Sequence, residues 1–181
     1  PIPSSGELIP IIGLGSARRY EDAQGEAQLA PLRDTFRRFR QLGGTVVDTA
    51  PSYGHAEQLM GGIMADLNIR RELFICTKVG VDTPEQGRAQ IEQSFRNLRT
   101  DRIDLLAVHN LRDITNQLAI LRELKQAGRI RYVGATTSFD RQYEAFEAMM
   151  RRETLDSIQI DYALDNRNAA ERIIPLAAER G

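Results

Sequence analysis

The chain has 181 residues, of which 41% are hydrophobic and 27% are charged, so it can bury one core and is not a disordered segment. Its net charge is −1, and its arginines stand in short pairs beside acidic residues, which favours solvated helix surfaces over a nucleic-acid-binding patch. No apolar run approaches the ~18 residues of a membrane span. Two histidines are too few for a histidine-rich metal site.

Short apolar runs alternate with segments of helical period along the whole chain. Six strands are predicted, at residues 9–15, 45–49, 73–78, 104–109, 131–135 and 157–161. Six helices are predicted, at residues 29–42, 57–64, from 83–85 onward, 117–126, 140–150 and 168–180. The runs are continuously apolar instead of alternating, which is typical of parallel strands covered on both faces. The pattern therefore predicts six βα units with no linker between them.

Regular alternation of this kind suits either a doubly wound sheet or a barrel. A dinucleotide-binding doubly wound fold needs G-x-G-x-x-G at the start of a helix, and here Arg18 occupies the third glycine position, with a polar loop after it. Polar residues at the ends of five strands converge only in a ring. We therefore expect an α/β TIM (β/α)8 barrel represented by its first six units. Residues 1–181 would form one domain with a gap between the first and sixth strands, and two more units are expected after Gly181.

Enzyme-like side chains stand at corresponding places in successive units. Asp48, Lys78 and His109 each end an apolar run, and Tyr53 lies one loop beyond the first of them. The carboxyl ends of barrel strands form the active-site face, so this arrangement indicates catalysis. Among 24 basic residues only two are lysines, and one is kept at a strand end, where a compact ammonium differs from a planar guanidinium. Cys76, the single cysteine, lies inside a run and is interpreted as core packing.

Several motifs carry a resemblance to a known family. Residues 48–61 resemble the D-T-A-x-x-Y-G-x-x-E-x-x-x-G signature of the aldo-keto reductases. The segments F-I-C-T-K-V at 74–79 and D-L-L-A-V-H-N at 104–110 are similar to that family's third and fourth strands, and residues 124–134 to its approach to the fifth. The resemblance covers essentially the whole chain in the right order. It implies a TIM barrel and a catalytic tetrad of Asp48, Tyr53, Lys78 and His109.

The resemblance also implies a cofactor. Family members bind a nicotinamide dinucleotide without a Rossmann fold, which makes NADP(H) the expected cofactor, with NAD(H) not excluded. Thr136, Thr137 and Gln159 match the positions at the ends of the fifth and sixth strands that hold the nicotinamide amide, where the usual pair is Ser-Asn instead of Thr-Thr. His55 is interpreted as a loop residue.

The four tetrad residues suit the chemistry of carbonyl reduction. A carbonyl needs a hydride at carbon and a proton at oxygen. An unperturbed phenol has a pKa of about 10, so Tyr53 needs a nearby cation that favours its ionised form, and Lys78 is that cation. Asp48 would keep the ammonium charged and fix its direction. His109 would donate a hydrogen bond to the substrate oxygen. No step requires a metal.

The sequence thus predicts an NAD(P)H-dependent oxidoreductase that reduces small aldehydes or ketones to alcohols, with Tyr53 as general acid. The alternative is a non-catalytic, cofactor-binding regulatory subunit or redox sensor. We expect a soluble bacterial protein in the cytoplasm, or in the periplasm if a leader has been removed. The expected partner is a small carbonyl compound, with no nucleic acid and no membrane, and the oligomeric state stays open.

Overall fold

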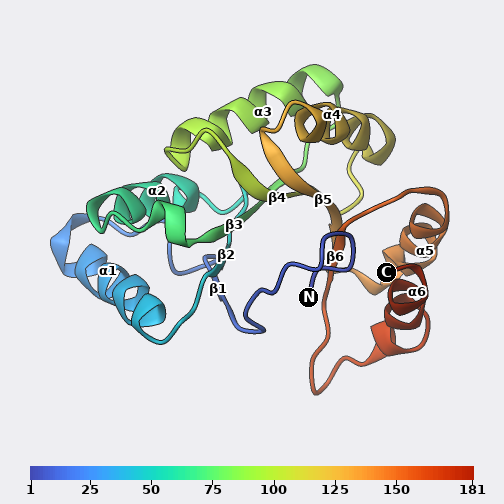
Figure 1. Ribbon diagram of the computed structural model, residues 1–181, viewed down its shortest axis with the longest axis horizontal. Coiled ribbons are helices and arrows are strands. Elements are labelled where there is room, and N and C mark those ends of the chain that lie inside the picture. The colour runs from blue at the N-terminus through green and yellow to red at the C-terminus, as the bar shows by residue number, and fades with distance from the viewer.

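Six parallel strands form one curved sheet in the computed structural model, which describes residues 1–181. The strands pair strictly in sequence order, so each pairs with its neighbours in the chain. Their bounds are β1 Gly13–Gly15, β2 Val46–Asp48, β3 Phe74–Val79, β4 Ile103–His109, β5 Ile130–Thr137 and β6 Ser157–Ile160. β1 and β6 do not pair with each other, and the sheet follows an open arc (Figure 1). The predicted fold class, the first six units of a TIM barrel, is confirmed.

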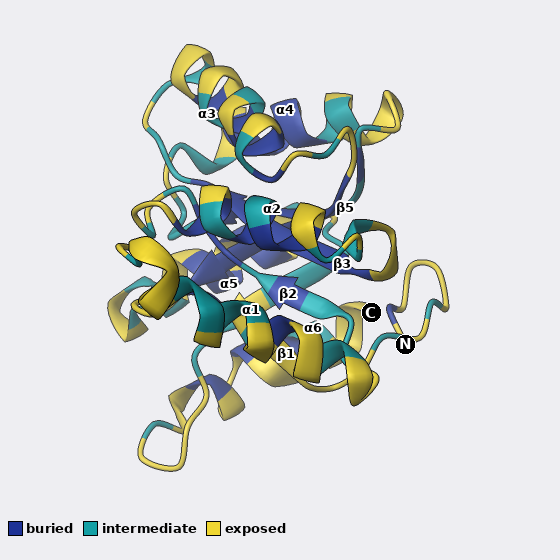
Figure 2. Ribbon diagram, turned by 90° about the vertical axis from the view of Figure 1, so that its left-hand side faces the viewer, coloured by how far each residue is buried: buried dark blue, intermediate teal, exposed yellow.

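Helices cover the convex side of the arc. They are α1 Gly25–Gln41, α2 Ala56–Asp66, α3 Pro84–Asn97, α4 Ile114–Gln126, α5 Tyr143–Arg152 and α6 Ile173–Arg180. Three short 3₁₀ helices, η1 Arg70–Glu72, η2 Asp140–Gln142 and η3 Asn168–Ala170, lie in the connections. Each helix turns one face to the strands and one to solvent (Figure 2). None of the helices is long and apolar enough to cross a membrane.

The third helix shows how the sequence sets these elements. Thr83 is its N-cap and accepts a hydrogen bond from the backbone N–H of Gln86 at 3.3 Å, while Pro84 occupies the first helical position. Ile91 and Phe95 follow one turn apart and are 1% and 5% exposed. Burying each of these side chains stabilises the fold by about 1.5–3 kcal/mol.

The first helix begins one turn earlier than predicted. It starts at Gly25 instead of about residue 29, so Pro31 lies in its second turn instead of its first. Side chains support this first turn: Gln28 accepts a hydrogen bond from the backbone N–H of Gln24 at 2.7 Å, and Arg33 pairs with Glu26 at 2.8 Å. Such contacts, which offset the disruption by a proline, are not visible in the apolar period.

Two apolar clusters lie on opposite faces of the sheet. The larger one fills the space between strands and helices and contains 28 buried residues. The smaller one lies on the concave face, where Ile2 packs against Phe74, Cys76 and Tyr132. The N-terminal segment therefore crosses the concave side of the arc near the start of the strands (Figure 1).

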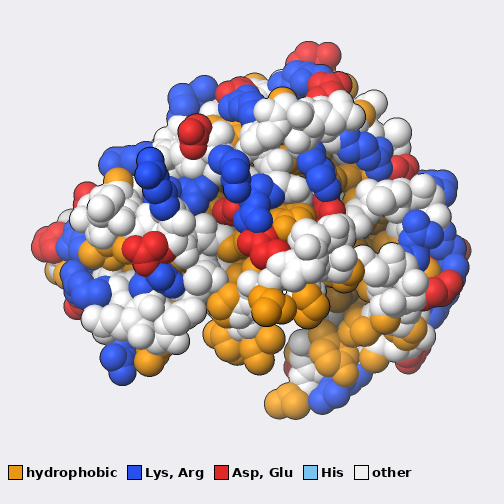
Figure 3. Space-filling model, in the orientation of Figure 1, with side chains coloured by type: hydrophobic (Ala, Val, Ile, Leu, Met, Phe, Trp, Pro, Cys, Tyr) orange, Lys and Arg blue, Asp and Glu red, His pale blue; other side chains and the backbone are white.

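The two open edges of the sheet are apolar. Ile11 and Ile12, just before β1, are 99% and 69% exposed, and Leu164, after β6, is 92% exposed. Hydrophobic side chains gather around the hollow between the two ends of the arc (Figure 3). The unpaired strands at the two edges of the sheet thus lie next to exposed apolar side chains.

Candidate active site

The predicted catalytic residues meet at the carboxyl end of the sheet. Asp48 is the last residue of β2, and Lys78 and His109 lie at the ends of β3 and β4. Lys78 is in register with Ala107, and His109 follows two positions later on the same face of β4. Both side chains therefore point to the concave side, with His109 one step nearer the rim.

Lys78 is held by a full set of acceptors. Its ammonium donates to both carboxylate oxygens of Asp48, at 2.9 and 2.8 Å, and to the backbone carbonyl of Thr49 at 2.9 Å. An ammonium has three hydrogens, so this geometry uses all of them. The lysine side chain is 3% exposed and that of Asp48 is 24% exposed. The result is a nearly dry, fixed positive charge beside a partly hydrated carboxylate.

Tyr53 is positioned by a tight turn after β2. Its backbone N–H donates to the carbonyl of Ala50 at 3.0 Å, and the next residue, Gly54, has φ +50. A Cβ on Gly54 would also lie 2.8 Å from the carbonyl oxygen of Glu21, so only glycine fits there. The phenol ring stands with its centre 5.4 Å from the Lys78 Nζ.

The sequence predicted that Lys78 is held by Asp48 and lies near the Tyr53 phenol. The structure has the contact with Asp48, but no hydrogen bond joins Lys78 to Tyr53, and the Thr49 carbonyl is the third acceptor of the ammonium instead. A main-chain acceptor of this kind has no signature in the sequence. The ammonium therefore lies near the face of the phenol ring without a hydrogen bond to it.

His109 completes the group. Its ring lies edge-on to that of Tyr53, with centres 6.2 Å apart and planes at 85°. Gly80 allows this close approach of β3 to β4, since a Cβ there would lie 3.0 Å from the His109 Cβ. Burial, with the Lys78 charge as a second cause, lowers the pKa of His109 to about 4. The imidazole is therefore neutral at pH 7 and carries one N–H donor.

The three predicted nicotinamide-binding residues divide between the two faces of the sheet. Thr136 is in register with His109 on one side and with Gln159 on the other, so these three form one row on the concave face. Thr137 points the opposite way, and its hydroxyl donates to the Gln142 side chain at 2.6 Å. Gln142 in turn donates to the carbonyl of Asn110 at 3.1 Å, next to the histidine.

A cavity of about 520 Å³ lies inside the arc beneath these residues. Asp48, Lys78 and Gln159 line it near the carboxyl end, and Ile2 and Phe74 line it near the amino end. Its volume is in the range of about 300–1,000 Å³ usual for small-molecule sites, and its walls combine apolar side chains with a few polar ones.

Sequence reasoning gave no role to Glu57, which lies behind the site. The carboxyl group is 3% exposed and accepts hydrogen bonds from Thr77 at 2.7 Å and from Asn97 at 3.2 Å. It thus ties the start of α2 to β3, next to Lys78, and to α3. Burial raises the pKa of this carboxyl. The position of Glu57 within the motif at residues 48–61 was the only sign in the sequence that this residue has a role.

Two other residues lie where the sequence suggested. His55 is exposed in the loop before α2, where its ring contacts the Gln58 side chain at 3.3 Å. Cys76 is buried in β3, and burial raises the pKa of its thiol. A thiol in this state is unreactive, in agreement with a packing role.

Comparison with known proteins relates this site to one family. The family model described as "Aldo/keto reductase family" matches residues 11–181. Aldo-keto reductase YhdN of Bacillus subtilis (strain 168) is 31% identical over 183 residues, which cover 93% of this chain and 54% of the relative. The NADH-specific methylglyoxal reductase of Escherichia coli (strain K12) is 26% identical, covering 82% of this chain and 53% of its own length. The chain thus spans about half the length of these curated relatives.

Solved structures share the fold. The crystal structure of PA4992 from Pseudomonas aeruginosa superposes with a TM-score of 0.81 at 28% identity, covering 99% of this chain and 74% of that one. An aldo-keto reductase from Klebsiella pneumoniae, solved in complex with NADPH, gives a TM-score of 0.76 at 22% identity over 95% of this chain and 61% of its own. At that identity the second likeness concerns the fold alone.

Proposed function

The chain belongs to the aldo/keto reductase family, and from that premise we propose that it carries the catalytic residues of an NAD(P)H-dependent reductase of aldehydes or ketones. One observation carries the proposal: a phenol, a fixed ammonium and a neutral imidazole converge at the carboxyl end of the sheet, above a cavity. A non-catalytic cofactor sensor would have no need for all three groups together.

In this proposal Tyr53 is the general acid. When bound, the nicotinamide cofactor supplies the hydride that adds to the carbonyl carbon. The carbonyl oxygen becomes negative as this occurs and takes the phenol proton from Tyr53. The charge left on the phenolate oxygen is stabilised by Lys78, which is buried and therefore poorly screened by water. Asp48 and the Thr49 carbonyl hold the ammonium in place.

His109 has the role of orienting the substrate. Because its pKa is lowered to about 4, it donates through a neutral N–H and does not compete with Tyr53 as an acid at pH 7. A hydrogen bond from this N–H to the carbonyl oxygen both fixes the oxygen and stabilises its developing charge.

We further propose that Thr136 and Gln159 hold the nicotinamide amide, since a hydroxyl and a carboxamide in the row of His109 suit an amide ligand. The Thr137 hydroxyl is already engaged by Gln142, so in this proposal Thr137 contributes by fixing the end of β5. NADP(H) is the expected cofactor. NAD(H) stays open, because one relative is named as NADH-specific and another fold neighbour was solved with NADPH.

The decisive experiment is Tyr53→Phe in the whole protein, assayed by NADPH and NADH oxidation with a panel of simple aldehydes. Turnover should fall by about 10²–10⁴-fold, while cofactor affinity measured by fluorescence titration should be unchanged. Tyr132→Phe is the matched control, because it removes a phenol hydroxyl at the amino end of the sheet. Wild-type protein that binds cofactor but turns over no aldehyde would support the sensor instead. Turnover by Tyr53→Phe within a few-fold of wild type would refute the role of Tyr53.

A further inference from the structure

A second groove lies at the opposite, amino end of the sheet. It has a volume of about 1210 Å³ and is formed by the connections that lead into β3, β4 and β5. Five arginines line it: Arg70, Arg71, Arg99, Arg102 and Arg131. The chain as a whole carries a net charge of −1, so this concentration of guanidinium groups is local.

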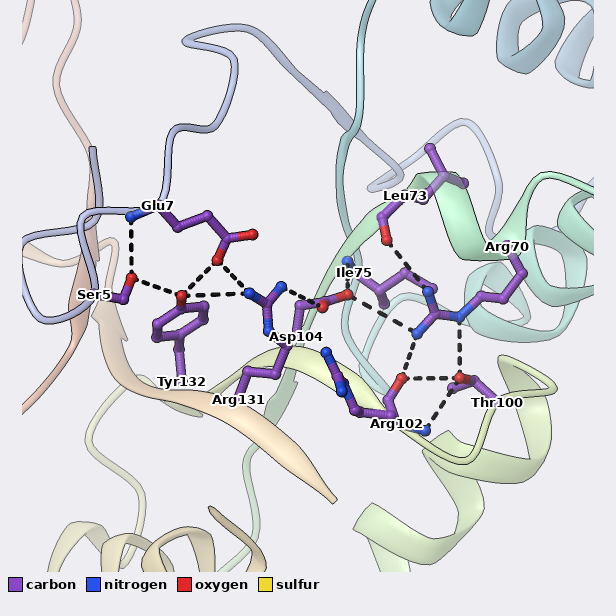
Figure 4. A network of polar contacts seen from close by, with 10 residues as sticks. All are labelled: Ser5, Glu7, Arg70, Leu73, Ile75, Thr100, Arg102, Asp104, Arg131 and Tyr132. Atoms are coloured by element: carbon purple, nitrogen blue, oxygen red, sulfur yellow. Dashed lines mark hydrogen bonds and ion pairs between the residues drawn. The ribbon is translucent and has the colours of Figure 1, made fainter. Parts of the chain in front are cut away.

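Two of the five arginines are structural. Arg131 donates to the buried Asp104 at 3.0 Å and also pairs with Glu7, which anchors the N-terminal segment (Figure 4). Arg70 lies 3.9 Å from the other oxygen of Asp104. Glu72, a further groove acid, is paired at 2.5 Å with Arg40, which lies outside the groove lining. Asp104, Glu7 and Glu72 therefore each already have an arginine partner.

The other three arginines have no partner in the protein. The side chains of Arg71, Arg99 and Arg102 are exposed and make no hydrogen bond or ion pair, and Asp101 is the only groove acid that is likewise unengaged. Three unpaired arginines and one unpaired aspartate thus line the same groove. The groove is left with a positive charge that the protein does not compensate.

The backbone that carries these groups is fixed. Arg70 donates from Nε to the Thr100 hydroxyl at 3.0 Å, from Nη1 to the Leu73 carbonyl at 3.2 Å, and from Nη2 to the Arg102 carbonyl, so it fastens two connections together. The Thr100 hydroxyl also donates to the Arg102 carbonyl at 2.8 Å. In Figure 4 the Arg102 side chain extends toward Arg131. Fixed loops reduce the entropy lost when a ligand is bound.

Arg99 has an unusual backbone conformation. It follows the end of α3 with φ +52, a left-handed conformation that is usually taken by glycine. This residue lines the wall of the groove.

We propose that this groove binds a small anion with several phosphate groups, at a site separate from the Lys78 cavity. Guanidinium groups form paired, charge-assisted hydrogen bonds with phosphate oxygens, and three of them spread along one groove match a chain of phosphates better than a single one. The phosphates could belong to an inorganic polyphosphate or to a nucleoside polyphosphate, because both present the same groups.

Calorimetric titration of the whole protein with sodium tripolyphosphate tests the proposal, with saturating NADP⁺ present so that any cofactor phosphate site is filled. Binding should weaken at least about 10-fold in each of Arg71→Gln, Arg99→Gln and Arg102→Gln, and should fall steeply with added salt. Arg152→Gln is the matched control, because this arginine is exposed and unpaired but lies on α5, outside the groove.

Three comparisons complete the test. Orthophosphate should bind at least about 10-fold more weakly than tripolyphosphate, because it can engage fewer guanidinium groups. ATP that binds as tightly as tripolyphosphate would identify the phosphate chain as the recognised group, and tighter binding of ATP would identify a nucleotide as the ligand. Tripolyphosphate binding that is absent, equal in the three variants and wild type, or equally reduced by Arg152→Gln would overturn the proposal. So would tighter binding of duplex DNA, which would assign the groove to nucleic acid.

Discussion

Replacing Lys78 by methionine should damage both stability and catalysis, and a second substitution should separate the two effects. Methionine keeps an unbranched chain but leaves Asp48 without its cation and the Thr49 carbonyl without its donor. Removal of one partner from a buried ion pair costs about 3–5 kcal/mol, because the remaining charge is uncompensated. The Asp48 side chain is 24% exposed, so water solvates part of that charge. We therefore expect a loss of about 2–3 kcal/mol.

The double variant Lys78→Met/Asp48→Asn removes the stranded carboxylate. Its free energy of unfolding, measured by urea denaturation at pH 7, should recover by at least about 1 kcal/mol relative to Lys78→Met. Turnover should stay at least about 10²-fold below wild type in both variants, because neither has a cation beside Tyr53. A double variant that regains turnover along with stability would show that Lys78 serves only to neutralise Asp48. A single variant as stable as wild type would contradict the burial argument.

Two further predictions concern Tyr53 and His109. Gly54→Ala should destabilise the protein by more than the roughly 1–2 kcal/mol cost of a positive φ, because its Cβ would also strike the Glu21 carbonyl. It should also lower turnover by displacing Tyr53. Gly128→Ala, at φ +72 with open space around it, is the control and should show the conformational cost alone in the same urea experiment. The depressed pKa of His109 means that the unfolded chain takes up a proton at about pH 6.5 while the folded chain does not until about pH 4, so stability should fall as pH is lowered through that window. His109→Gln should flatten this dependence, and an unchanged slope would assign it to other groups.

The sequence was most informative where a side chain follows a buried strand. A continuous apolar run such as that of β3 predicts a strand, its length places Lys78 at the carboxyl end, and parallel pairing brings the strand ends together. The same reasoning places Asp48 and His109 beside Lys78 without knowledge of any contact between their side chains. The short β1 was less visible, because only residues 13–15 pair and two of them are glycines.

Two details of the site geometry could not be predicted from the sequence, each for a physical reason. The third acceptor of Lys78 is a backbone carbonyl, which every residue possesses, so nothing marks Thr49 in advance. The division of Thr136 and Thr137 between the two faces depends on the register of β5 within one residue, because successive side chains alternate. An error of one residue in the predicted register of β5 would therefore exchange the roles of Thr136 and Thr137.

The position of the cavity follows from side-chain sizes along the concave face. Leu105 and Tyr132 lie side by side in the row nearer the amino end, where Ile2 and Phe74 also pack. The next row toward the carboxyl end, in register with Lys78, contains only Ala107, Gly134 and Ser157. Small side chains at that level leave space directly below the ammonium, whereas bulky ones close the arc beneath it. The same strands that carry the polar groups at their ends therefore also border the cavity below them.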